Sequence, residues 1–117
     1  MKAPQELEQR WVLLQHWLKE RFGRLPDLNA VLFLIGLQET GVHKSQFSKE
    51  EKQDLMHVGV CTVLSLSGYY RRVRIDVEGW PHFEIEKPLP PLSTDEQELL
   101  LKEHVLRYFE PYLNKKR

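Results

Sequence analysis

Hydrophobic residues recur every three to four positions along four stretches of the chain, which is the spacing of a helix. The second and third stretches are apolar around most of the cylinder, which is typical of central, buried helices. The pattern predicts helices over residues of about 4–22, 27–39, 48–67 and 93–113. Residues that favour a helix start stand at three of these bounds, as an N-cap or as a capping box: Asp27, Ser48 with Glu51, and Ser93 with Glu96.

Between the third and fourth helices the apolar residues change to alternate positions, over 69–86, which predicts a β-hairpin. A three-residue loop over 77–79, with Gly79 left-handed, keeps one face of the hairpin apolar, whereas a two-residue turn would mix the faces. The expected pairs are Val73 with Phe83, Ile75 with Pro81, Arg72 with Glu84, and Arg74 with His82. One face should then pack on the helices, and the following side chains should look outward: Arg72, Arg74, Asp76, Trp80, His82 and Glu84.

These elements predict an α+β protein that is mostly α: four helices, with one two-stranded antiparallel β-hairpin between the third and the fourth helix. A chain of 117 residues is long enough to bury one core, so a single compact domain over 1–117 is expected. The basic segment 114–117 is predicted to be a frayed tail.

Charge and cysteine content narrow the class of protein. The 17 basic and 17 acidic residues cancel, and both signs are spread evenly, so the sequence lacks the basic field that non-specific phosphate binding needs. The single cysteine excludes an intrachain disulfide. The polar first ten residues do not resemble a signal peptide, and the longest apolar run, 30–37, is too short to span a bilayer. We therefore expect a cytoplasmic protein without a membrane segment.

Four chemically reactive side chains share one face of the predicted third helix: Glu50, Asp54, His57 and Cys61. Zinc centres use three or four ligands, and structural centres usually have several thiolates, whereas this face has one thiol and one imidazole. Cys61 stands mid-helix among apolar residues, which is typical of a small core residue and not of an activated nucleophile. No metal and no cofactor are expected. His16 and His104 fall opposite the apolar arcs and should be exposed.

The first and fourth helices have apolar arcs of about half a cylinder, wider than the usual stripe of about 100°. The extra width comes from a candidate dimer face: Leu13, Trp17, Leu101, Tyr108 and Tyr112. Either a second chain covers these side chains, or the hairpin and the two central helices cover them.

The first functional hypothesis is a non-enzymatic protein–protein interaction module, with a homodimer as one of its forms. Trp80 beside the hairpin turn is the best candidate for a partner-binding anchor, because tryptophan is enriched in binding hot spots. His82, Arg72 and Arg74 are its expected outward neighbours. Packing of Trp80 across the edge of the hairpin is the alternative.

The second hypothesis is a winged-helix-like nucleic-acid-binding protein, because three helices followed by a hairpin is the order of that fold, with Arg71, Arg72 and Arg74 on the wing. The acidic start of the third helix, residues 48–54, counts against it, so nucleic acid is a disfavoured partner. An enzyme is the weakest hypothesis, since the chain has no phosphate-binding glycine loop and no nucleophile motif. A pocket formed by Tyr69, Tyr70, Arg72 and His82 stays open.

Overall fold

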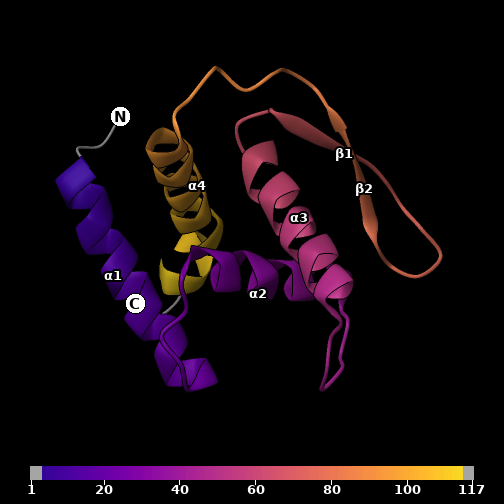
Figure 1. Ribbon diagram of the computed structural model, residues 1–117, viewed down its shortest axis with the longest axis horizontal. Coiled ribbons are helices and arrows are strands. Elements are labelled where there is room, and N and C mark those ends of the chain that lie inside the picture. Colours follow the sequence, from indigo (N-terminus) through magenta and orange to yellow (C-terminus); the bar gives the residue numbers. More distant parts are fainter. Residues whose placement is uncertain (1–3, 115–117) are drawn as a thin grey trace.

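The computed structural model describes residues 4–114, and the fold class predicted from the sequence is confirmed: four helices and a two-stranded antiparallel sheet between the third and the fourth (Figure 1). The elements in chain order are α1 (Pro4–Phe22), α2 (Leu28–Thr40), α3 (Lys49–Ser65), β1 (Tyr70–Ile75), β2 (Pro81–Ile85) and α4 (Thr94–Asn114). Each helix bound lies within two residues of its expected position. The predicted frayed tail lies outside the described residues except for Asn114.

The helices begin where the capping residues predict. The Asp27 carboxylate accepts a hydrogen bond from the backbone N–H of Ala30 at 2.9 Å. At the start of α3, the Ser48 hydroxyl accepts from the N–H of Glu51, and the Glu51 carboxylate accepts from the N–H of Ser48. The same reciprocal pair of bonds starts α4, between Ser93 and Glu96. Each box satisfies two N–H groups that a helix start otherwise leaves without a partner.

Two glycines bring the backbones of α2 and α3 into direct contact. A Cβ atom at Gly36 of α2 would overlap the carbonyl oxygen of Leu55 in α3. A Cβ atom at Gly59 of α3 would overlap the carbonyl oxygen of Leu32 in α2. The contact is reciprocal, because each glycine faces the residue one turn before the other glycine. The two helices therefore cross at a distance that only glycine permits at both positions.

The core lies between α1, α2, α4 and the C-terminal half of α3. Its main cluster of buried residues is Leu7, Trp11, Leu14, Leu18, Val31, Leu32, Ile35, Val63, Leu64, Val105, Leu106 and Phe109, and Leu55, Val58 and Cys61 of α3 are buried as well. Four of them, Leu7, Trp11, Leu14 and Leu18, follow one another at intervals of three or four residues along α1. Phe22, the next residue at this spacing, is 59% exposed, because it stands in the last turn of α1, beyond the depth of the core.

The prediction that His104 is exposed is wrong. His104 is buried in α4, with Nε2 2.7 Å from the Ser67 hydroxyl oxygen and Nδ1 2.7 Å from the carbonyl oxygen of Leu100. Ser67 follows α3, and the ring of Tyr69 lies 6.4 Å from the His104 imidazole, so the end of α3 covers the side of α4 that the helical pattern assigned to solvent. Helical periodicity does not reveal how many neighbours cover a helix.

The hairpin register is partly as predicted. Ile75 pairs with Pro81 and Arg74 pairs with His82, as expected, but Arg72 pairs with Phe83 instead of Glu84. The cause is an irregularity between Arg72 and Arg74, a β-bulge that leaves Val73 without a partner and shifts the rest of β1 by one residue. Gly79 has the predicted positive φ, at 92°, which confirms the left-handed residue of the loop.

None of the four helices described is both long enough and apolar enough to cross a membrane.

We expect Gly36→Ala and Gly59→Ala each to destabilise the fold by about 3 kcal/mol or more, because the new methyl group meets a backbone carbonyl that cannot rotate away. At an open helix position the same substitution would stabilise by about 1 kcal/mol, so the sign of the change is diagnostic. Urea unfolding followed by circular dichroism measures it. Gln53→Ala, on the exposed side of α3, is the control. A stabilised Gly59→Ala variant would contradict the close crossing.

We expect Gly79→Val to destabilise the hairpin by roughly 1 kcal/mol or more, because a β-branched residue is strained at positive φ. Space is not the cause, since a Cβ at this position would lie 3.5 Å from the Thr40 carbonyl oxygen, an ordinary contact. Gly79→Asn, which tolerates the left-handed region better, should cost less. Equal losses in the two variants would show that the residue is not held at positive φ.

Candidate partner-binding surfaces

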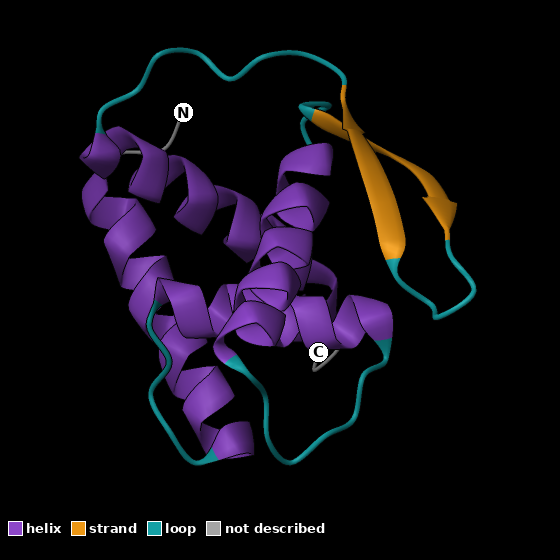
Figure 2. Ribbon diagram, turned by 45° about the vertical axis from the view of Figure 1, so that its right-hand side comes forward, coloured by secondary structure: helices purple, strands orange, loops and turns teal. Residues whose placement is uncertain are grey.

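The hairpin projects from the helical body and meets it mainly along α3 (Figure 2). The bulge in β1 changes which side chains of this strand face the helices. Arg72, expected to look outward, lies on the side of β1 that faces the helices, and its Nη2 donates to Oε1 of Glu39 in α2 at 2.7 Å. The prediction that Arg72 points away from the body is therefore wrong, because the register shift places it opposite Phe83.

The other two arginines of β1, Arg71 and Arg74, are exposed, as Arg72 is despite its bond to Glu39. Arg71 donates to the carboxylates of Glu86, at 3.0 Å, and Glu84, at 3.2 Å. The Glu86 hydrogen bond is the main cause that raises the pKa of Arg71. Arg74 forms no ion pair with any residue that the structure describes. Two of the three positive charges of the expected wing are thus neutralised within the chain.

The Asp76 carboxylate organises the hairpin turn. Its Oδ1 accepts from the backbone N–H groups of Glu78 and Trp80, each at 3.0 Å, and its Oδ2 lies 2.9 Å from Nε2 of His82. The His82 contact is the main cause that lowers the pKa of Asp76. His82 is thus tied to the turn, and Trp80 is half-buried against its own chain and not fully turned to solvent.

The hairpin and the connector that follows expose aliphatic side chains that the sequence had assigned to a covered face or had not singled out. They are Val73, Ile75, Val77, Ile85 and Leu89. Pro81 is buried and Tyr70 and Phe83 are half-buried, while Ile85 remains 71% exposed. Alternation in the sequence shows that a hairpin has an apolar face, but it does not show how much of that face the rest of the chain covers.

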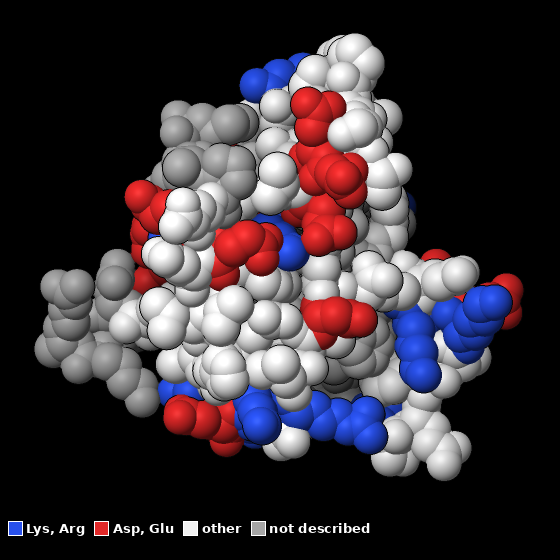
Figure 3. Space-filling view, turned by 60° about the vertical axis from the view of Figure 1, so that its left-hand side comes forward, with Lys and Arg blue, Asp and Glu red and all other residues white. Residues whose placement is uncertain are grey.

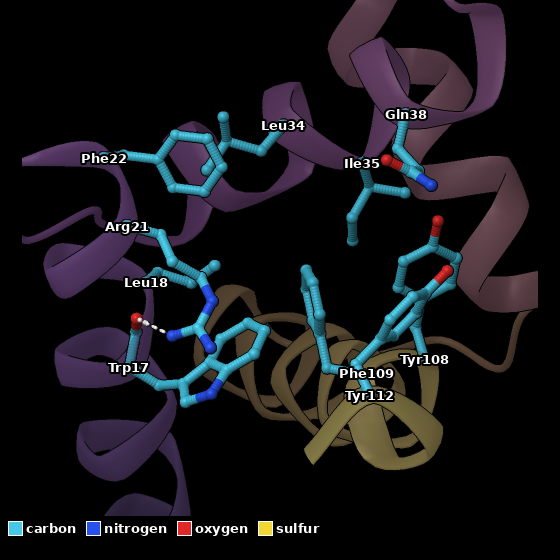
Figure 4. Close-up of a pocket in the computed structure, with 10 residues that line it drawn as sticks. All are labelled: Trp17, Leu18, Arg21, Phe22, Leu34, Ile35, Gln38, Tyr108, Phe109 and Tyr112. Carbon is cyan, nitrogen blue, oxygen red and sulfur yellow. Dashed lines mark hydrogen bonds between the residues drawn. The ribbon is translucent and has the colours of Figure 1, made fainter. Parts of the chain in front are cut away.

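The five candidate dimer-face residues do not form one face. Leu13 on α1 is 70% exposed, whereas Leu101 is half-buried and packs against the core. Trp17, Tyr108 and Tyr112 instead line a groove between α1, α2 and α4 (Figure 4). The wide apolar arcs of the first and last helices are therefore largely used within the chain.

Tyr108 connects this groove to the hairpin. Its hydroxyl donates to Oε2 of Glu39 at 2.6 Å, while the other oxygen of the same carboxylate accepts from Arg72. Burial raises the pKa of Tyr108, and the neighbouring Glu39 carboxylate raises it further. Glu39 thus holds α4 and β1 to the C-terminal end of α2.

The pocket considered for Tyr69, Tyr70, Arg72 and His82 is not assembled in the structure. Arg72 is bonded to Glu39 and His82 to Asp76, on opposite sides of the hairpin. Tyr69 and Tyr70 pack partly against the core, and Lys87 Nζ lies 4.7 Å from the centre of the Tyr69 ring. These four side chains do not converge on a common point.

A serine–histidine pair that the sequence analysis missed joins α3 to α4. Arg107 donates from Nη1 to the Ser67 hydroxyl oxygen at 2.8 Å, and the Ser67 hydroxyl in turn bonds Nε2 of His104. The arginine hydrogen bond occupies a lone pair of the serine oxygen, which lowers its nucleophilicity. With Nδ1 of His104 donating to the Leu100 carbonyl, every member of the cluster has a partner, and the cluster acts as a clasp between the two helices.

Cys61 is a buried core residue, as predicted. Its Sγ lies 3.7 Å from Nε2 of His57, but His57 itself is exposed, and burial raises the pKa of the Cys61 thiol to about 11. Glu50 and Asp54 are exposed on the same side of α3. Within residues 4–114, no group of three or more His, Cys, Asp or Glu side chains is placed to hold a metal ion.

Both signs of charge are interspersed on the face seen in Figure 3: acidic groups lie in its upper part and also at its lower left and right, and lysines and arginines lie along its lower edge and right side and also at its top. Comparisons with protein-family models, with curated proteins and with solved structures found no match to this chain. Assignment of a function therefore depends on the geometry of the hairpin and the groove.

We expect Cys61 to resist alkylation by iodoacetamide in the native protein at pH 8, because a thiol with a pKa of about 11 is almost wholly protonated there and is also buried. The rate should stay low below that pKa and should rise to that of a free thiol in urea. Mass spectrometry measures the labelled fraction. His57→Ala should leave the rate within about twofold, since the shift has burial as its cause. Rapid labelling of the native protein, lost in His57→Ala, would instead indicate an activated thiol.

Proposed function

We propose that the protein is a small, cytoplasmic, non-enzymatic protein–protein interaction module that contacts its partner through the hairpin. The observation that carries the proposal is the set of exposed aliphatic side chains on this projecting element, led by Ile75, Val77 and Ile85. Apolar groups gathered in this way on one exposed element are typical of interaction sites.

The face of the hairpin, and not its edges, suits such a contact. β1 contains a bulge and three arginines, and β2 begins with Pro81, which has no N–H to donate. Bulges, charged residues and prolines are the features by which sheet edges avoid pairing with further strands. Contact through side chains is therefore favoured over strand addition. The partner is either another protein or a second copy of this chain.

The nucleic-acid alternative has less support. Arg71 and Arg72 are paired with carboxylates, and release of either one to a phosphate would leave a carboxylate without its partner. Only Arg74 among the three is unpaired within the described part of the chain. The start of α3 also carries Glu50, Glu51 and Asp54.

Two exposed aliphatic residues provide a matched test, since Ile85 on the hairpin is 71% exposed and Leu13 on α1 is 70% exposed. We expect Ile85→Glu to weaken capture of the partner, or self-association, at least about tenfold, a loss of about 1.4 kcal/mol. Leu13→Glu should have no effect, and both variants should keep the wild-type melting temperature. Pull-down from a lysate of the source organism and light scattering measure the two forms of binding.

The opposite result, loss with Leu13→Glu and not with Ile85→Glu, would place the contact on α1 and reject the hairpin. If neither variant changes capture or mass in solution, the apolar surface of the hairpin is not an interaction site. Salt-sensitive binding of duplex DNA that is weakened by Arg74→Ala would favour the nucleic-acid alternative.

A further inference from the structure

The groove between α1, α2 and α4 has the size of one aromatic ring. Its volume is about 160 Å³. For comparison, an apolar cavity of roughly 150 Å³ in another protein holds a benzene molecule. Leu18 and Ile35 form its buried floor, and Phe22 stands at its rim (Figure 4). A ligand much larger than a substituted ring would have to remain partly outside.

The walls of the groove are aromatic, with one edge-to-face pair of rings and one tilted pair. The rings of Trp17 and Phe109 are 6.2 Å apart at an interplanar angle of 62°, and those of Phe109 and Tyr112 are 6.1 Å apart at 57°. An inserted ring would therefore meet both faces and edges of its neighbours. Offset and edge-to-face contacts are the arrangements that aromatic pairs favour.

One cation is fixed at the wall of this apolar groove. The Arg21 guanidinium stacks on Trp17, with Cζ 3.7 Å from the centre of the indole ring, and its Nη1 donates to the Trp17 carbonyl oxygen at 3.1 Å. These two contacts hold the guanidinium in place. Its Nε and Nη2 groups form no hydrogen bond with the described residues. Arg21 has no carboxylate partner among the described residues. The free edge of a guanidinium matches a carboxylate, which it binds with two parallel hydrogen bonds.

We propose that this groove is a binding site for a small aromatic monocarboxylate. The ring packs in the groove against Trp17 and Phe109, and the carboxylate pairs with Arg21. The charge of Arg21 selects an anion, and the limited volume selects a single ring. This site is separate from the hairpin surface and does not depend on the interaction function proposed for it.

Benzoate and benzyl alcohol are matched probes, because they have the same ring and differ in charge. In ¹H–¹⁵N NMR titrations of the full chain, we expect benzoate to shift the indole resonance of Trp17 and the amides around Phe109, with a dissociation constant of about 1 mM or tighter for so small a ligand. Benzyl alcohol should bind at least tenfold more weakly.

Arg21→Gln should weaken benzoate binding at least tenfold, while Arg24→Gln should change it less than twofold. Arg24 is an exposed arginine close by in sequence that does not line the groove, so it controls for general electrostatic attraction. Both residues are exposed, and thermal melting verifies that both variants are folded.

Three results would overturn the proposal: no shift of the Trp17 indole at about 10 mM benzoate, well above the expected constant; equal weakening by Arg21→Gln and Arg24→Gln; or benzyl alcohol binding as tightly as benzoate. None of these results bears on the hairpin surface, which the Ile85 and Leu13 variants test.

Discussion

The reciprocal contact of Gly36 and Gly59 is the constraint on which the remaining packing depends. Because each helix admits the backbone of the other, α2 and α3 cross at a distance that leaves no room for a Cβ atom at either glycine. Helices held at such a crossing keep both of their ends in fixed places. The C-terminal end of α2 then lies under the hairpin, and the C-terminal end of α3 reaches α4.

Glu39 lies one turn beyond Gly36, at the end of α2 whose position the crossing fixes. Its two carboxylate oxygens accept hydrogen bonds from β1 and from α4. One side chain therefore helps to fix both the orientation of the hairpin relative to α2 and the position of Tyr108 in the groove. At the other end of the crossing, the Ser67–His104–Arg107 clasp holds α4 to the end of α3. The two ends of the α2–α3 pair are thus each joined to α4 by polar contacts, while the core between them is apolar.

Features set by neighbours in the sequence could be predicted, and features set by neighbours in space could not. Caps such as Asp27 and the Ser48–Glu51 box depend on residues three apart, and the positive φ of Gly79 depends on a tight loop, so local patterns were sufficient. The burial of His104 depends on Ser67, 37 positions away, and no periodicity in α4 indicates it. The bulge in β1 could not be predicted either, because polar and apolar residues go on alternating through it in the sequence.

Gly36 and Gly59 could have been recognised from the sequence as residues needed for helix packing. An isolated glycine weakens a helix by about 1 kcal/mol relative to alanine, so two of them in otherwise regular apolar helices indicate a packing requirement. "HVGVC" draws attention to His57 and Cys61, yet the glycine between them is the residue that the fold requires. The same limit applies to the candidate site. The sequence predicted Trp17, Tyr108 and Tyr112 as part of a candidate dimer face, covered either by a second chain or by the rest of this one. The arrangement of α1, α2 and α4 makes them line a groove.

The separation of the groove from the hairpin has a consequence for any function that uses both. Tyr108 lines the groove, and its hydroxyl shares the Glu39 carboxylate with Arg72 of β1, so the two surfaces are connected by two consecutive hydrogen bonds of 2.6 and 2.7 Å. A group that displaced Tyr108 would take a donor from Glu39 and would leave Arg72 as its sole partner there. The hairpin meets the body mainly along α3, and the Arg72–Glu39 salt bridge joins it to α2. The geometry therefore supplies a physical link between the two surfaces, although each is defined by its own side chains.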